Sequence, residues 1–258
     1  MRQIRIIPCL QLANQRLVKT VKFKIGNYIG DPVNTIKIFN DLEVDELCFL
    51  DITASGKNKL PDFNLLRQIA NECFMPLSYG GGINSLEAAK NIFSIGFEKI
   101  VLNTAAVRHP KLIGKIAEHF GNQAIIAAVD VRKNLFGRHE AVTNNGRDKI
   151  GVPVVEWAQR LEAEGAGEIL LTSIDRDGSW KGYDIHIIEK IARAVSIPVI
   201  ANGGAGKLRH LTEAIEKGAS AVAVSSLVLY QNKDMGVLIN YRVREIKPAL
   251  ALNQIYSS

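Results

Sequence analysis

The sequence PLSYGGGINSL, at residues 76–86, returns in altered form as PVIANGGAGKL, at residues 198–208, and this pair of segments decides the predicted fold. The two segments lie 122 residues apart, so the glycines at 81–82 coincide with those at 203–204. Each segment begins as a short apolar run, which is typical of a buried strand, and then reaches a glycine pair before a helical pattern starts. The chain therefore contains two copies of one strand–turn–helix unit.

A second correspondence sets the beginning of the chain against its middle. IIPCLQ, at residues 6–11, matches IIAAVD, at residues 125–130, with a spacing of 119 residues. A duplication explains both correspondences. We predict one domain, residues 1–258, built from two half-barrels that cover approximately residues 1–122 and 123–258.

The remaining apolar runs complete a regular alternation of strands and helices. Continuous apolar runs are typical of strands buried on both faces of a parallel sheet. They predict strands near residues 5–10, 45–51, 76–79, 99–103, 124–130, 168–173, 198–201 and 221–225. Helical patterns open at Asp31-Pro32, Asp62 and Ser85, and near Pro110, Pro153, Asp184 and Lys207. Eight such units in 258 residues predict a closed (β/α)8 barrel, a TIM barrel. The alternative, an open doubly wound sheet, normally has a GxGxxG loop after its first strand, and none stands there.

The charge, apolar runs, cysteines and histidines of the sequence exclude several classes of partner and site. The net charge is +6, but the basic residues are dispersed and the 7% of aromatic residues form no stacking ladder, so an anionic small molecule is a better predicted partner than nucleic acid. The longest apolar runs are too short for a membrane span, and we predict a cytoplasmic protein. Three cysteines, an odd number, are expected to be reduced. Five scattered histidines show no ligand spacing, so we predict no metal and no cofactor.

Two connections are long, residues 11–30 and 131–151, and both follow the carboxyl ends of predicted strands. That end carries the active site in barrel enzymes. We expect a functional loop over residues 11–30 and, within the second connection, a small hairpin over residues 137–146.

The glycine pairs predict two anion sites. Backbone N–H groups at glycine can approach a phosphate closely, and small polar side chains complete the cradle. The same glycines could instead serve only to make tight turns. Two symmetric copies favour phosphate binding and imply one ligand with a phosphate at each end. The predicted cradles are formed by Gly81, Gly82, Asn103 and Thr104 in one half, and by Gly203, Gly204, Ser225 and Ser226 in the other.

The repeat also pairs Asp130 with Gln11, each at the end of its strand. A carboxylate at the mouth of a barrel can act as a general acid or base, although it could also be purely structural. The amide of Gln11 has no proton to exchange near pH 7. Lys19, in the first long connection, could hold an anionic group or be a solvated charge.

Four charged residues lie near the beginnings of strands: Arg5, Glu46, Lys99 and Glu168. They could ring the barrel axis as an ion-paired plug or form ordinary surface ion pairs, and the sequence does not separate these interpretations.

Several longer motifs in the sequence are specific to one protein family. Over nearly its full length the chain resembles the cyclase subunit of imidazole glycerol phosphate synthase. The matching segments are RIIPCL (5–10), GDPV (30–33), DELCFLDITAS (45–55), PLSYGGGI (76–83), LNTAAV (102–107), GAGEILLTSIDRDG (165–178), GYD (182–184) and IPVIANGGAG (197–206). The sister isomerase shares the duplicated barrel but has different strand motifs.

The resemblance implies that a separate glutaminase docks on the amino-terminal face and supplies ammonia. The ammonia would split and cyclise a bis-phosphorylated aminoimidazole carboxamide ribotide, in histidine biosynthesis, at the opposite face. It implies that Arg5, Glu46, Lys99 and Glu168 form the ammonia gate. Positions used in the family's site match Lys19, Asp51, Asn103, Thr104, Asp130, Thr172, Asp177, Gly203, Gly204, Ser225 and Ser226.

The sequence departs from the family's pattern at three neighbouring positions. Gln11 stands where the family has a catalytic Asp, Thr20 where it favours Gly, and Lys22 where it favours Asn. The primary prediction is a cyclase subunit. One alternative is a diverged paralogue that channels ammonia to another substrate, such as an acetamidino sugar of surface polysaccharide. The other is a non-catalytic scaffold for a glutaminase.

Overall fold

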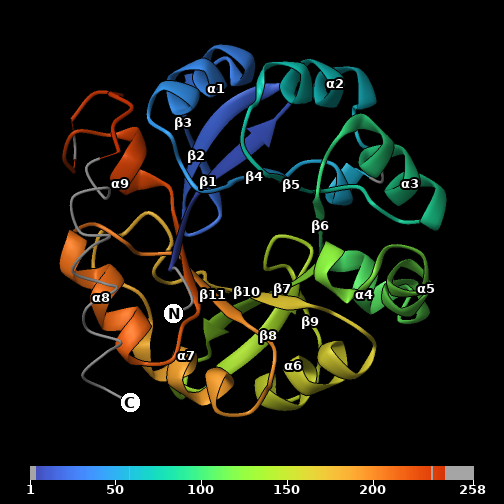
Figure 1. Cartoon of the computed structure of the whole chain (residues 1–258). Helices are drawn as coiled ribbons and strands as arrows, with labels where there is room; N and C mark the ends of the chain where they lie inside the picture. The colour runs from blue at the N-terminus through green and yellow to red at the C-terminus, as the bar shows by residue number, and fades with distance from the viewer. Residues whose placement is uncertain (1–3, 58, 234, 242–258) are drawn as a thin grey trace.

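Eight parallel strands close into a ring in the computed structural model, which describes residues 4–57, 59–233 and 235–241. The strands are β1 (Arg5–Ala13), β4 (Leu47–Asp51), β5 (Leu77–Gly80), β6 (Lys99–Leu102), β7 (Ile125–Lys133), β10 (Glu168–Ser173), β11 (Val199–Asn202) and β12 (Ala221–Val224). Each pairs with the next, β12 pairs with β1, and the pairing of β7 with β10 completes the circle. The predicted TIM barrel is confirmed, and Figure 1 shows its helices surrounding the strands.

The main helices of the described chain start where the sequence predicts. They are α1 (Pro32–Asp41), α2 (Phe63–Glu72), α3 (Leu86–Ile95), α5 (Lys111–Phe120), α6 (Val154–Ala163), α7 (Ile185–Ala192) and α8 (Leu208–Glu216). The side chains of Asp31, Asp62 and Ser85 each accept a hydrogen bond from a backbone N–H of the first turn. These caps satisfy donors that a helix leaves open at its amino end. Within the described ranges no helix is both long and apolar enough to cross a bilayer.

The structure has two short helices that the sequence does not predict, α4 (Thr104–Arg108) and α9 (Ser226–Leu229). They follow β6 and β12 and begin 122 residues apart, the spacing of the sequence repeat. With five and four residues they are too short to show a helical period. Their matching positions support the proposed duplication. The boundary between the halves near residue 122 stays a prediction.

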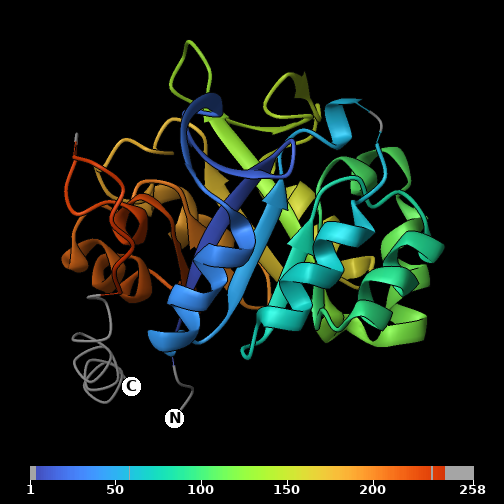
Figure 2. The ribbon, with the colours of Figure 1, turned by 90° about the horizontal axis from the view of Figure 1, so that it is seen from above.

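The sequence predicts a loop over residues 11–30, but in the structure this connection is antiparallel sheet with two turns. β1 continues to Ala13 and pairs with β2 (Arg16–Val21), which pairs with β3 (Lys24–Gly30). Its two turns place Asn14, Gln15, Lys22 and Phe23 at positive φ. Such turns favour Asn and Gly, so Lys22-Phe23 gives no turn signal. The second connection forms the expected hairpin, with β8 (His139–Thr143) and β9 (Asp148–Lys149). Figure 2 shows both hairpins at the same end of the barrel.

The inside of the barrel is a narrow apolar layer. Along a strand every second side chain points to the same face, so residues of one parity line the barrel axis. The inward cluster is formed by Ile7, Cys9, Cys48, Val101, Ile126, Leu170, Ile200, Ala221 and Ala223. The larger core lies between the strands and the helices. On β1 the inward series runs from Arg5 through Ile7 and Cys9 to Gln11. On β6 it includes Lys99 and Val101, and Asn103 follows directly after the strand. The barrel interior therefore connects the predicted gate to the predicted site.

Candidate active site

A cavity of about 220 Å³ opens at the carboxyl ends of the barrel strands. This is the end at which barrel enzymes carry out their chemistry. Its floor is apolar and its walls carry three carboxylates and several amides and hydroxyls. The predicted site residues that line it are Gln11, Asp51, Gly81, Gly82, Asn103, Thr104, Asp130, Thr172, Asp177 and Ser225. The structure thus brings together side chains from both halves of the chain.

Asp130 has the properties of a general acid or base. It lies in β7 directly opposite Thr172 of β10, and Asn103 donates a hydrogen bond from Nδ2 to Asp130 Oδ2 over 3.1 Å. Burial raises the pKa of Asp130 to about 7, with a further contribution from the negative charge of Asp177. Hydrogen bonds from Thr172 and Asn103 oppose this rise in the pKa. A carboxyl with a pKa near neutrality can both take and give a proton at physiological pH.

Gln11, the counterpart of Asp130, is used differently. Its Oε1 accepts a hydrogen bond from the backbone N–H of Thr20 at 2.8 Å, and its Nε2 donates to Thr20 Oγ1 at 2.9 Å. Both residues are buried. The amide therefore holds the β2–β3 hairpin.

Lys19 and Asp177 form a buried ion pair beside this contact. Lys19 Nζ lies 2.7 Å from Asp177 Oδ1 and also donates to the backbone oxygen of Thr20 at 2.6 Å. Thr20 Oγ1 donates to the other oxygen, Asp177 Oδ2, at 2.6 Å. The ammonium group of Lys19 is thus engaged by the protein itself.

The predicted cradle of the first half opens onto the cavity. Gly81 and Gly82 both have positive φ, and Thr143 donates from Oγ1 to Asn103 Oδ1 at 2.7 Å. A Cβ atom on Gly81 would lie 2.5 Å from the backbone oxygen of Asp51, so only glycine fits the turn. The carboxylate of Asp51 accepts hydrogen bonds from Thr53 and from the backbone N–H of Ala54, and so fixes this turn.

The predicted cradle of the second half is arranged differently. The segment at residues 176–182 covers its glycines: Gly182 N–H donates to the backbone oxygen of Gly204, and a Cβ atom on Gly204 would clash with Gly182. Neither Gly203 nor Gly204 lines the main cavity. Ser225 does, and its buried Oγ has no hydrogen-bond partner among the described residues. Ser226 instead lines a neighbouring cavity of about 240 Å³ together with Lys19.

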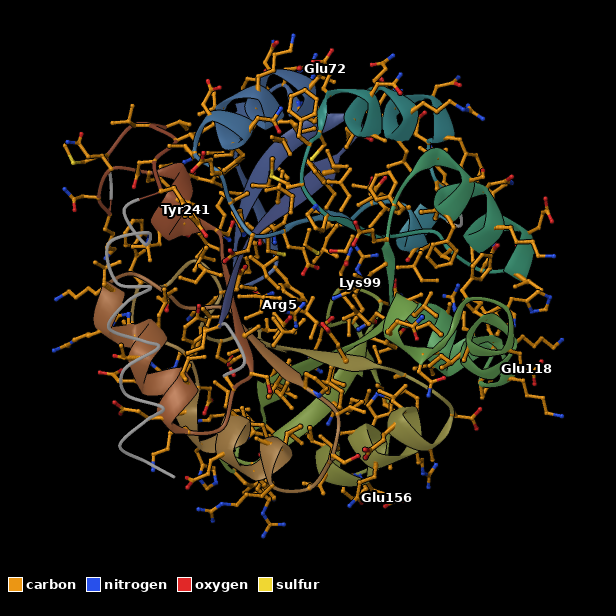
Figure 3. The ribbon with its side chains drawn as sticks, viewed as in Figure 1. Arg5, Glu72, Lys99, Glu118, Glu156 and Tyr241 are labelled. Carbon is orange, nitrogen blue, oxygen red and sulfur yellow. The ribbon has the colours of Figure 1, made fainter. Side chains whose placement is uncertain are left out.

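The four charged residues at the opposite end do form a ring, and Figure 3 shows Arg5 and Lys99 near the middle of the circle of strands. Arg5 contacts Glu46 at 2.8 Å and Glu168 at 3.0 Å, while Lys99 lies 3.0 Å from Glu168 and 3.7 Å from Glu46. Burial raises the pKa of Glu46. Burial opposes the charge of Arg5, but the two glutamates raise its pKa overall. Ordinary surface ion pairs are thereby ruled out for these residues.

Several residues of the cavity carried no prediction as site residues. The cavity is also lined by Thr20, Ser55, Asn145, Arg147 and Asn202. Arg147 places a positive charge at the wall of the cavity that Gly82 and Thr104 also line. Asn145 lies in the predicted hairpin and Arg147 directly after it, and the position of that hairpin after a strand end is a signal that could have pointed to both. Across the described ranges, no three His, Cys, Asp or Glu side chains gather as they would around a metal ion.

The comparisons with known proteins agree with this geometry. The family described as "Histidine biosynthesis protein" matches residues 5–234. A Pseudomonas aeruginosa protein named "Putative imidazole glycerol phosphate synthase subunit hisF2" is 50% identical over 92% of this chain and 95% of its own length. The imidazole glycerol phosphate synthase subunit HisF of Streptomyces coelicolor is 42% identical over 90% of this chain and 93% of its own length. The chain therefore belongs to the histidine biosynthesis protein family, in which it is similar to the HisF subunits of imidazole glycerol phosphate synthase.

Proposed function

We propose that this protein is the cyclase subunit of a glutamine-dependent synthase of the HisF type. Ammonia from a glutaminase docked at the amino-terminal face would pass along the barrel axis. At the carboxyl end it would react with a bis-phosphorylated aminoimidazole carboxamide ribotide, giving imidazole glycerol phosphate and aminoimidazole carboxamide ribotide. The observation that carries the proposal is Asp130, a carboxyl with a pKa of about 7 at one end of an apolar interior whose other end is a ring of ion pairs.

The barrel interior supports passage of a neutral molecule. Its side chains are Ile, Val, Leu, Ala and Cys, which give an ion no compensation for lost water. Ammonia would cross this layer far more readily than ammonium. At the ring, Glu46 Oε1 and Glu168 Oε2 are buried without a hydrogen-bond partner among the described residues. These two oxygens would accept N–H groups from nitrogen entering between the charged side chains.

At the carboxyl end of the barrel, different residues would transfer protons and bind the two phosphates. Asp130 would move protons during cyclisation, and Asn103 would orient its carboxyl. The glycine turn with Thr104 would hold one phosphate. The second phosphate would be held by Ser225 and Ser226, with Lys19 beside it. The closed hairpin would have to move for one ligand to reach both ends.

A second candidate is a paralogue that delivers ammonia to a different substrate, such as an acetamidino sugar precursor. The observation that favours it is the contact of Gln11 with Thr20. Two of the three positions at which the sequence departs from the family's pattern are hydrogen-bonded to each other, so these two departures form one contact in the site.

Purified protein should be incubated with the bis-phosphorylated ribotide and an ammonium salt, and formation of imidazole glycerol phosphate followed. Turnover that disappears in Asp130→Asn supports the cyclase. A protein that binds a glutaminase but leaves the ribotide intact supports the second candidate, provided that ammonia released by the glutaminase is consumed with another acceptor. Failure of both reactions, with glutaminase activation intact, would leave the scaffold interpretation.

A further inference from the structure

Gln11 makes a two-ended contact that needs both an acceptor and a donor on its side chain. Its carbonyl oxygen faces the N–H of Thr20, at 2.8 Å, and its NH2 group faces the hydroxyl of the same residue, at 2.9 Å. The backbone N–H can only donate, so the amide oxygen must lie on that side. The orientation of the amide is thereby fixed by its partner.

The hydroxyl of Thr20 extends the contact to the ion pair. It has one hydrogen, which it donates to Asp177 Oδ2 at 2.6 Å. The oxygen of this hydroxyl must therefore accept from position 11, and only a donor there satisfies it. Asp177 in turn holds Lys19 at 2.7 Å. The chain of donors thus runs in one direction, from Gln11 through Thr20 to Asp177.

All four members of this chain are buried, with exposed fractions of 9% for Gln11, 4% for Lys19, 1% for Thr20 and 6% for Asp177. A buried polar network is stable only when every member has its partner, so loss of one donor is felt by the others. The network also lies between the main cavity and the neighbouring one, since Thr20 lines the first and Lys19 the second.

We propose that Gln11 is a positioning residue: through Thr20 it fixes Lys19 on Asp177 and holds the β2–β3 hairpin closed across the mouth of the barrel. Gln11 transfers no proton and orients the ammonium group that faces the second cavity. This role goes beyond the proposed reaction and does not depend on which substrate is used.

Gln11→Glu is the sharpest test, because it keeps the shape of the side chain and can change the donor to an acceptor. The introduced carboxyl still donates to Thr20 while it is protonated and so preserves the contact, whereas the ionised carboxylate has no hydrogen to donate. Position 11 is faced by Lys19 and Asp177 through the hairpin, by Asp51 at the end of neighbouring β4, and by Asp130 across the cavity. Burial, together with the carboxylates of Asp51 and Asp177 against one ammonium group, keeps an added carboxyl protonated to higher pH than usual, and Asp130 adds its negative charge above its pKa of about 7.

Amide hydrogen exchange of the hairpin, residues 16–30, should be measured at pH 5 and pH 8 and corrected for the intrinsic rates. In Gln11→Glu we expect exchange about 10- to 100-fold faster than in the unchanged protein at pH 8, and near its rate at pH 5, because the ionised carboxylate leaves the buried Thr20 oxygen without its donor. The control is Gln68→Glu, the same chemical change on the exposed face of α2. Equal exchange in Gln11→Glu and the unchanged protein at both pH values would overturn the proposal.

A second pair of variants keeps the test independent of charge at position 11. Thr20→Ser retains the hydroxyl and should leave the hairpin protected, whereas Thr20→Val removes it and should speed exchange at both pH values. Acetylation of Lys19 by acetic anhydride, followed by mass spectrometry, should rise about 10-fold in Thr20→Val and stay unchanged in Thr20→Ser. Because neither readout needs a substrate, failure of the proposed reaction would leave this result standing. Equal labelling in the two variants would contradict the proposal.

Discussion

Asp130 and Gln11 occupy matching positions in the two predicted halves of the chain, and they differ in what their side chains bind. Asp130 is held by two residues that leave its carboxyl free to titrate near pH 7. Gln11 has both ends of its amide bound to one residue of the adjoining hairpin. One half keeps a group that can exchange a proton, and the other has turned the same position into an attachment for a hairpin.

The phosphate cradles differ in the same sense. Gly81, Gly82 and Thr104 line the main cavity, whereas Gly203 and Gly204 do not. Both pairs pack against a neighbouring loop, since a Cβ atom would clash with the backbone oxygen of Lys59 at Gly82 and with that of Gly182 at Gly204. The closed hairpin lies on the segment at residues 176–182, because Lys22 N–H donates to the backbone oxygen of Asp177. The first cradle thus opens onto the main cavity, whereas Ser226 of the second opens onto the neighbouring one.

The largest expected effect separates Asp130 from Gln11 directly. Asp130→Asn removes the titrating group and should lower ammonia-dependent turnover by about 10²- to 10⁴-fold. Initial rates with saturating ammonium salt, without a glutaminase, measure the effect on chemistry alone. Gln11→Glu serves as the comparison variant, since it changes the hairpin and leaves Asp130 in place. Unchanged turnover in Asp130→Asn would remove the acid/base assignment.

The next effect tests whether positions 11 and 20 act as one unit. Gln11→Asp shortens the side chain and removes the donor, which should lower the free energy of unfolding by about 1–3 kcal/mol. Thr20→Gly should cost a similar amount. In the double variant the combined loss should be smaller than the sum by about 1 kcal/mol, because each change alone breaks the same contact.

Urea unfolding of the four proteins closes this double-mutant cycle. A combined loss equal to the sum, within about 0.3 kcal/mol, would mean that the two residues are independent and that their contact contributes nothing. A glycine at position 20 beside an aspartate at position 11 also recreates the pattern that the resemblance assigns to the family. Turnover of the bis-phosphorylated ribotide gained only in the double variant would favour the diverged paralogue.

The contrast between these two residues also marks the limit of sequence analysis. Strands and helix starts could be predicted because apolar runs and caps such as Asp31, Asp62 and Ser85 are local signals. The ring of Arg5, Glu46, Lys99 and Glu168 could be placed at one end because all four lie near strand starts. In each case a short stretch of chain contains the physical cause of the structure.

The β2–β3 hairpin lacked such a local cause. Lys19 and Thr20 are polar yet buried, and they are buried because Asp177, more than 150 residues away, accepts their hydrogen bonds. The coverage of Gly203 and Gly204 likewise depends on a loop from another unit of the barrel. Departures at Gln11 and Thr20 were visible in the sequence, but their contact was not, because it arises only when the hairpin folds back.

A smaller effect concerns the pH dependence of stability. The pKa of Asp130 in the folded protein, about 7, lies above its ordinary value of 3.8. The folded state therefore keeps a proton that the unfolded chain releases, so this contribution to stability is present below pH 4 and is lost as the pH rises to about 7. Asp130→Asn does not titrate and escapes the loss. Relative to the unchanged protein, this variant should gain about 1–2 kcal/mol between pH 4.5 and pH 8, after allowance for water in the cavity.

Urea unfolding at both pH values measures this difference, and all other titrations cancel because the two proteins share them. A constant difference between the proteins would show that the carboxyl of Asp130 is ionised across the whole range, as an ordinary solvated aspartate is.

The smallest effect sharpens the comparison of the two cradles. Arg147 lines the open cavity with Gly82 and Thr104, and it is exposed, so its attraction for an anion is partly screened by water. Arg147→Gln should weaken binding of inorganic phosphate about 3- to 5-fold, measured by calorimetry at low ionic strength. The control is Arg138→Gln, an equal change of charge at an exposed position of the β7–β8 turn away from the cavity. A matching loss in both variants would mean that net charge alone attracts the phosphate. A loss confined to Arg147→Gln would place the anion in the main cavity, onto which the first cradle opens, and would distinguish that cradle from the second.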